Sequence, residues 1–153
     1  MSCNRQYSVT VNNQTVYTPN AAGSGYQVPD PDLQGCINLA LRQQNVINPA
    51  DLLALSCANA DVSDIAGIDG FPLLRFLDLA NNQLLDLSPL AQLPQLSGLN
   101  LPNNAISDIA TLLAMRTLIV VNLEGNSRIP CDQLDTLQNR LGTGLSRPVT
   151  CRP

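Results

Sequence analysis

The sequence LRFLDLANNQLLDLSPLAQLPQ occupies residues 74–95, and LSGLNLPNNAISDIATLLAMRT follows it directly at residues 96–117. The two stretches align position by position over 22 residues. A related unit precedes them at residues 52–73, and a partial unit, LIVVNLEGN, follows at residues 118–126. A fixed period of this length indicates a stack of similar units, each of which buries its hydrophobic face only against its neighbours.

Each unit opens with the pattern L-x-x-L-x-L, whose alternation predicts a short strand with one face in the core. An Asn follows each strand at Asn82, Asn104 and Asn126, where the chain turns away. We expect these side-chain amides to satisfy buried backbone groups of the neighbouring coil and so to form a ladder along the stack. The residues predicted to point inward from the strands are Leu77, Leu79, Leu99, Leu101, Val121 and Leu123.

The second half of each unit carries apolar residues two to three positions apart. This spacing predicts a turn or a 3-10 segment, because a 22-residue unit leaves little room for a full α-helix. Asp64, Asp86 and Asp108 occupy equivalent positions. We interpret them as local turn caps, with the carboxylate accepting from a backbone N–H, in preference to a shared catalytic role.

The segments that flank the repeats divide the chain into four parts: an N-terminal arm at 1–29, a helical cap at 30–50, the repeats at 51–126 and a closing cap at 127–153. In the arm, apolar and polar residues alternate from Tyr7 to Thr18, which predicts a pair of strands with Asn12-Asn13 as the turn. A free hairpin and an ordered arm that lies on the body both fit this pattern. Asp30-Pro31-Asp32 predicts the start of the first cap helix.

The closing cap begins after Asn126, where the 22-residue pattern breaks off. The run RIPCDQLDTLQNRLG predicts a helix whose leucines share one face, ended by Gly142 or Gly144. An open stack of repeats requires such caps, because its end units would otherwise expose their hydrophobic faces to water.

The pattern L-x-x-L-x-L-x-x-N-x-[IL]-x-D-[IL] with this period resembles the leucine-rich repeats of the bacterial internalin type, and residues 96–109 follow it throughout. The first unit departs from it, since Cys57 replaces the second inward Leu and Ala60 replaces the Asn. The resemblance implies an α/β fold: a short right-handed leucine-rich-repeat solenoid with a parallel sheet on the concave face, turns or 3-10 segments on the convex face, and helical caps. It also implies that the concave face binds other proteins.

The composition excludes several functional classes. A chain of 153 residues with 44% hydrophobic and 13% charged residues is one ordinary globular domain. A net charge of -4 argues against nucleic-acid binding, which needs clustered cations. The absence of His from the sequence excludes His-containing triads and zinc sites of familiar spacing. We therefore expect neither catalysis nor a metal or other cofactor.

Four of the five cysteines fall in two pairs at the ends of the stack. Cys36 lies on the apolar side of the first cap helix and Cys57 takes an inward position in the first coil, so we predict a disulfide between them. Cys131 and Cys151 bracket the closing cap, and we predict a second disulfide there. The alternative is four buried thiols in a reduced cytosol, but two well-placed pairs favour an oxidising compartment.

Cys3 is the fifth cysteine, and it stands ahead of the arm. We hypothesise that Cys3 is the lipid-attachment residue of a bacterial lipoprotein, with Met1-Ser2 in place of a signal peptide. The alternative is an unmodified thiol. This hypothesis predicts an extracytoplasmic protein, either periplasmic or on the cell surface, that contacts the membrane only through its lipid.

The outward residues of the strands form the predicted concave surface. An exposed Phe among small and polar residues is typical of a binding hot spot, although a single exposed Phe is also ordinary. We therefore predict a protein-binding surface, with a glycan-binding module and a structural spacer as alternatives. The predicted contact residues are Phe76, Asp78, Asn100, Val120, Asn122 and Glu124.

Overall fold

A computed structural model describes residues 9–11, 14–17 and 25–151. Its first two strands, β1 (Val9–Val11) and β2 (Gln14–Tyr17), pair antiparallel. The predicted strand pair in the arm is therefore confirmed. The Asn12-Asn13 turn and Cys3 lie outside the described residues.

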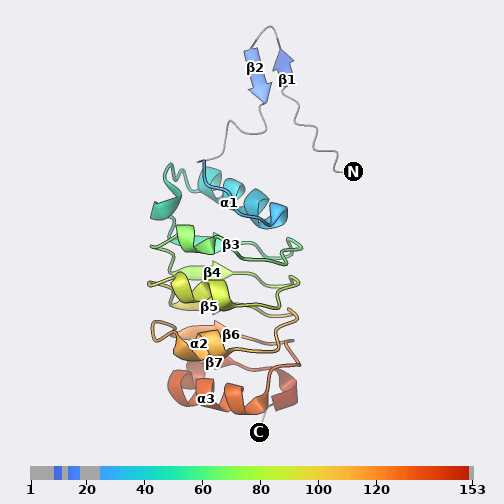
Figure 1. The fold of residues 1–153 in the computed structure, drawn as a ribbon, viewed down its shortest axis with the longest axis vertical. Coiled ribbons are helices and arrows are strands. Elements are labelled where there is room, and N and C mark those ends of the chain that lie inside the picture. The colour runs from blue at the N-terminus through green and yellow to red at the C-terminus, as the bar shows by residue number, and fades with distance from the viewer. Residues whose placement is uncertain (1–8, 12–13, 18–24, 152–153) are drawn as a thin grey trace.

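The repeats and the C-terminal cap together form one parallel sheet of five short strands in chain order (Figure 1). In-register partners lie one period apart, so that Leu55 pairs with Leu77, Leu77 with Leu99, and Leu99 with Val121. Each coil thus adds one strand and one inward residue to a continuous stack. The strands are β3 (Ala54–Ser56), β4 (Phe76–Asp78), β5 (Gly98–Asn100), β6 (Val120–Asn122) and β7 (Leu145–Ser146).

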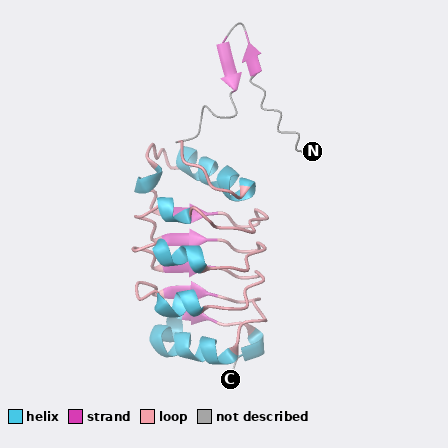
Figure 2. Cartoon of the chain, in the orientation of Figure 1, coloured by secondary structure: helices cyan, strands magenta, loops and turns pink. Residues whose placement is uncertain are grey.

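Short helical segments cover the opposite side of the core from the concave face of the sheet (Figure 2). The segments η2 (Ile68–Gly70) and η3 (Ser88–Gln92) are 3-10 helices, as the repeat spacing predicts. The third, α2 (Ala110–Ala114), differs from the prediction because it is a turn of α-helix. Its sequence ATLLA holds the good helix formers Ala and Leu, whereas η2 contains Gly70 and η3 contains Pro89.

The core lies between the sheet and these segments. The strand residues predicted to point inward are all at most 1% exposed. The regularly spaced apolar residues in the second half of the two central units are at most 8% exposed: Leu84, Leu87, Leu90, Leu93, Ile106, Ile109, Leu112 and Met115. Each such side chain contributes roughly 1.5–3 kcal/mol when it is fully buried. Because the core is continuous from coil to coil, stacking stabilises units that would not fold alone.

The Asn ladder is present as predicted. Asn104 donates from Nδ2 to the carbonyl oxygen of Leu79 at 2.9 Å and accepts at Oδ1 from the backbone N–H of Leu84 at 3.0 Å, both in the preceding coil. Asn82 and Asn126 make the equivalent bonds one coil earlier and later. One side chain per coil thus satisfies backbone groups that the strand-to-turn corner would otherwise leave unpaired.

The equivalent aspartates of the repeat cap turns, as predicted. Asp64, Asp86 and Asp108 each accept at Oδ1 from the backbone N–H two residues later, at 2.8, 2.8 and 2.9 Å. For Asp86, hydrogen bonds from the hydroxyl and the backbone of Ser88 hold the pKa of the carboxyl below its ordinary value. The recurrence of Asp at this position of the repeat therefore has a local structural reason.

The N-terminal cap consists of α1 (Pro31–Gln43) and η1 (Pro49–Asp51). Asp30 caps α1, since its Oδ1 accepts from the backbone N–H of Asp32 and Leu33 at 3.0 and 2.9 Å. Its Oδ2 accepts from the backbone N–H of Ser63 and Asp64, each at 3.0 Å. One buried carboxylate therefore joins the cap helix to the first repeat.

The C-terminal cap consists of α3 (Cys131–Leu141), η4 (Gly142–Gly144), β7 and η5 (Val149–Cys151). Gly142 ends α3 with a φ of 55°, in agreement with the predicted stop. The strand β7, which pairs parallel with β6, was not predicted. It is two residues long and carries no repeat signature, so only its contact with β6 identifies it.

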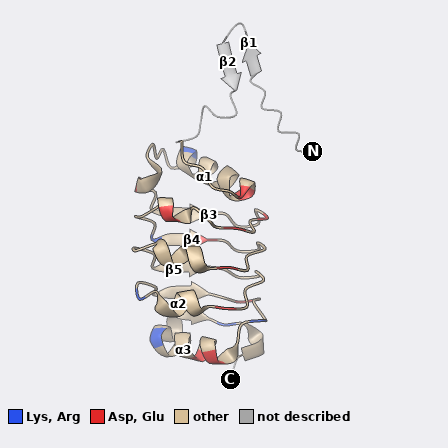
Figure 3. Cartoon of the chain, viewed as in Figure 1, with Lys and Arg blue, Asp and Glu red and all other residues tan. Residues whose placement is uncertain are grey.

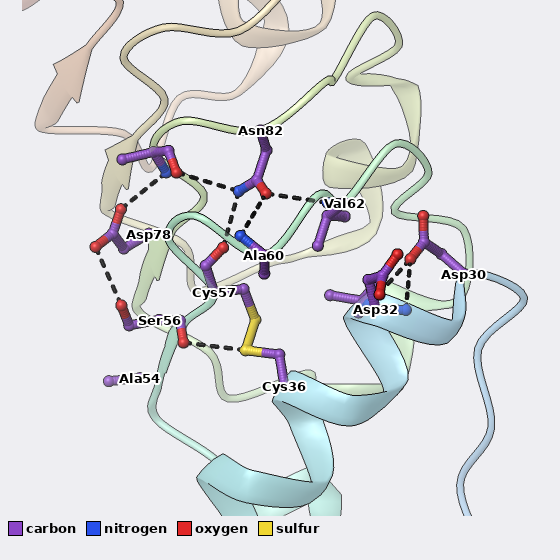
Figure 4. Close-up of a disulfide and its surroundings, with 12 residues drawn as sticks. Asp30, Asp32, Cys36, Ala54, Ser56, Cys57, Ala60, Val62, Asp78 and Asn82 are labelled. Carbon is purple, nitrogen blue, oxygen red and sulfur yellow. Dashed lines mark hydrogen bonds between the residues drawn. A yellow bond between two sulfur atoms is a disulfide. The ribbon is translucent and has the colours of Figure 1, made fainter.

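Both predicted disulfides are confirmed. Cys36 of α1 is bonded to Cys57, which follows β3 and is 2% exposed (Figure 4). Cys131, the first residue of α3, is bonded to Cys151 in η5. The Cα–Cα distances of 5.7 and 5.4 Å are ordinary for disulfides. The first bond links the N-terminal cap to the first repeat, and the second closes a loop within the C-terminal cap.

Candidate binding surface on the concave face

Two parallel rows of side chains run across the concave face of the sheet. The strand register places four residues of β3 to β6 in each row, and successive members of a row sit on neighbouring strands. The apolar row is Ala54, Phe76, Gly98 and Val120, and the polar row is Ser56, Asp78, Asn100 and Asn122. Five of the six predicted contact residues therefore lie in two adjacent rows, and the sixth, Glu124, follows the end of β6.

Two members of the apolar row expose large hydrophobic area. Phe76 is 45% exposed and Val120 is 55% exposed. The Phe76 ring leans toward the next strand, since a Cβ added to Gly98 would lie 2.8 Å from its Cδ2 atom. The missing side chain of Gly98 therefore gives the ring its place on the sheet. Ile119, which precedes β6 and was not predicted, adds a neighbouring apolar side chain that is 66% exposed.

The polar row is held together by hydrogen bonds between its own members. Asp78 accepts at Oδ2 from the Ser56 hydroxyl at 3.1 Å and at Oδ1 from the Asn100 amide at 2.9 Å. It also accepts from the backbone N–H of Ala80 at 3.0 Å. These bonds come from three consecutive coils. The polar row is thus ordered in the protein alone.

The far end of the polar row repeats this local geometry. Asn122 accepts at Oδ1 from the backbone N–H of Glu124 at 3.0 Å, the same bond that Asp78 makes to Ala80. The row then continues to Ser146, which is the register partner of Asn122 on β7. Sequence reasoning missed Ser146 because nothing in the sequence assigned it to the sheet.

Charged side chains are scattered over the described coils without a basic cluster (Figure 3). Within residues 25–151, Arg147 and Asp135 form an ion pair at 2.8 Å, and it lies in the C-terminal cap. A pocket of about 190 Å³ is lined by loop residues outside the two rows: Asn104, Ala105, Ile106, Ser127 and Arg128. Arg128 is the charged residue in this lining.

In the described part of the chain, the Cys, Asp and Glu side chains form no group of three that could hold a metal ion. None of its helices has the length and apolar character needed to cross a membrane. The two concave rows are therefore the candidate site.

Comparison with solved structures finds the same architecture in proteins of Listeria monocytogenes. The internalin InlF of strain 4b F2365 superposes with a TM-score of 0.69 and 27% sequence identity over 84% of this chain. The chain is an internalin-like leucine-rich-repeat protein. No protein-family model matches its sequence, and no curated protein sequence does so either.

A second internalin, InlC2 of the same strain, superposes with a TM-score of 0.58 and 26% identity over 65% of this chain. This internalin-like chain spans 39% of the length of InlF and 46% of the length of InlC2. The comparison therefore identifies the repeat fold, and it covers less than half of each relative.

Proposed function

We propose that this internalin-like chain is a non-enzymatic module that binds another protein through its concave face. The observation that carries the proposal is the exposed pair of Phe76 and Val120 beside an ordered polar row. Exposed aromatic and aliphatic groups next to fixed polar groups are typical of interaction hot spots. Phe76 is the anchor, Val120 extends the apolar contact, and the polar contacts are Asp78, Asn100, Asn122 and Glu124.

The proposal includes a location. Two disulfides favour an exported protein, because such bonds persist in oxidising compartments. We place the protein outside the cytoplasm of a bacterium and assign lipid attachment to Cys3, which would tether it to the envelope. Mass spectrometry of the full-length protein from its own host tests the anchor. A Cys3 without a lipid adduct would refute it and leave the binding proposal intact.

The binding proposal is tested by capture from an envelope extract of the native organism. The wild type is compared with a Phe76→Ala/Val120→Ser variant that loses both exposed anchors. Leu85→Ser is the matched control, because Leu85 is 60% exposed and lies outside the two rows. All three proteins are first shown to melt at the same temperature.

A protein captured by the wild type and by the control, but not by the double variant, supports the concave site. Equal capture by all three proteins would move the site elsewhere. If no protein is captured and soluble glycans raise the melting temperature of the wild type alone, the surface is a glycan-binding site and the proposal is wrong.

A further inference from the structure

The negative charge at Asp78 is an exception within its row. The other members, Ser56, Asn100 and Asn122, are neutral. Asn122 makes the same backbone bond through a neutral amide that Asp78 makes through a carboxylate. The repeat geometry at this position is thus satisfied without a charge. The backbone bond of the repeat therefore does not by itself require the carboxylate at position 78.

Within residues 25–151, this carboxylate has no cationic partner. Its three hydrogen-bond donors, the Ser56 hydroxyl, the Asn100 amide and the Ala80 N–H, are all neutral. Among residues 25–151, no basic side chain forms an ion pair with Asp78. This includes Arg75, which precedes the same strand. Asp78 is nevertheless partly buried and held in one position. A fixed, partly desolvated carboxylate favours a cation more than a mobile surface carboxylate does.

The exposed aromatic ring belongs to the same strand. Phe76 and Asp78 are successive outward residues of β4, which places their Cα atoms about 7 Å apart on one face. The ring lies over Gly98, and therefore along the sheet next to the polar row. An aromatic face beside a carboxylate suits one side chain particularly well. A guanidinium group stacks on the ring and donates a hydrogen bond to Oδ2 of the carboxylate, which accepts from one of the three donors, whereas Oδ1 accepts from two.

We propose that Phe76 and Asp78 together receive an arginine side chain of the partner protein. The inference rests on the proposed function and specifies the chemistry of its central contact. The planar, forked guanidinium fits both the ring face and the carboxylate, whereas a lysine ammonium is a compact, strongly hydrated charge that uses the ring less well. The acidic balance of the chain, with a net charge of -4, attracts the same kind of partner.

The test is an NMR titration of the full chain with three short peptides. They are acetyl-Gly-Arg-Gly-amide, its lysine analogue, and its citrulline analogue, which keeps the planar shape of arginine and lacks the charge. We expect the arginine peptide to shift backbone amide signals of β4 and β5 in a saturable manner. The lysine peptide binds less tightly, and the citrulline peptide produces no saturable shift.

Two variants separate the contributions of the pair. Asp78→Asn retains the capacity for the backbone bond seen at Asn122, and it lowers the affinity for the arginine peptide about tenfold. Phe76→Ala lowers this affinity about threefold, the range of an exposed cation–π contact. Asp61→Asn is the control for a lost charge elsewhere, and it leaves the affinity unchanged. Asp61 is exposed and has a φ of 59°, which Asn also tolerates.

The proposal is overturned if the citrulline peptide binds as well as the arginine peptide, if the shifts map outside β4 and β5, or if Asp78→Asn leaves the affinity unchanged. Absence of any saturable shift also overturns it. In each of these cases, the wild type could still capture a protein that the Phe76→Ala/Val120→Ser variant does not capture. Failure of this inference is therefore distinguishable from failure of the proposed function.

Discussion

Asn126 is 1% exposed, and its single amide group serves two coils. It accepts from the backbone N–H of Ile106 and donates to the carbonyl oxygens of Leu101 and Leu123, with the two donated bonds at 2.8 and 3.0 Å. No water reaches these backbone groups readily, so the side chain replaces hydration. At the residue scale, the repeat therefore depends on one polar side chain per coil as well as on leucines.

We expect Asn126→Ala to lower the free energy of unfolding by about 2–4 kcal/mol, because it leaves a buried donor and buried acceptors unsatisfied. Urea unfolding followed by circular dichroism measures the change. Asn139→Ala, on the exposed face of α3, is the control and should change stability by less than about 0.5 kcal/mol. Equal stabilities of the two variants would contradict a structural role for the ladder.

Asp30 gives the stability a pH dependence. Burial alone would raise the pKa of its carboxyl, but hydrogen bonds from Leu33, Ser63 and Asp64 outweigh burial, and the pKa lies below its ordinary value of 3.8. A lowered folded-state pKa stabilises the fold above the unfolded-state pKa. This stabilisation is lost as the pH falls through the folded-state value.

We therefore expect the urea midpoint of the wild type to fall as the pH is lowered from about 6 to 2, and to fall less steeply in Asp30→Asn. The variant keeps a residual slope, because the pKa values of Asp86 and Asp108 are also lowered. Parallel curves for the two proteins would show that Asp30 does not contribute to this pH dependence.

At the scale of elements, the closing helix is tied to the last convex segment by Arg140. Its guanidinium donates to the carbonyl oxygens of Leu112, Leu113 and Met115 at 2.7, 3.2 and 2.9 Å. These carbonyls belong to the C-terminal end of α2 and the residue after it, where a helix leaves acceptors unpaired and favours positive charge. One side chain of α3 thus caps α2.

Arg140→Ala should therefore cost about 1–2 kcal/mol of unfolding free energy, and Arg140→Lys should recover only part of it, because an ammonium cannot reproduce the fork of donors. Thermal and urea unfolding provide the comparison. The exposed Arg116, mutated to Ala, is the matched control. If the lysine variant were as stable as the wild type, charge alone would account for the contact.

At the scale of the whole molecule, a stack of coils is stabilised mainly by contacts between neighbours, so unfolding is expected to begin at an end. The two caps and the two disulfides stand at those ends. The C-terminal bond encloses α3 and β7, the last strand of the sheet. It therefore restrains the end of the stack at which the sheet has its shortest strand.

Replacement of Cys131 and Cys151 by Ala should lower the free energy of unfolding by about 3 kcal/mol, the value for closure of a loop of roughly 20 residues. Hydrogen exchange should show loss of protection in β7 and α3 before any loss in α1. The Cys36→Ala/Cys57→Ala variant is the converse control and should open first at α1. Uniform loss of protection in both variants would argue for a single cooperative unit.

The sequence by itself determined the stack. The inward leucines, the Asn ladder, the capping aspartates and the exposure of Phe76 all follow from the 22-residue period, because equivalent residues of identical coils meet the same environment. The disulfides were also predictable from position, since Cys36 and Cys57 lie where the N-terminal cap meets the first repeat, and Cys131 and Cys151 bracket the closing cap.

Only the tertiary structure decided the features that involve segments outside the period. Examples are the pairing of β7 with β6 and the hydrogen bond from Ser63 to Asp30. Further examples are the hydrogen bonds from Arg140 to the end of α2 and the position of the Phe76 ring over Gly98. Each depends on side-chain geometry or on contacts between segments far apart in the sequence. Such contacts occur once and leave no periodic trace, so their energies become apparent only when the coils are packed together.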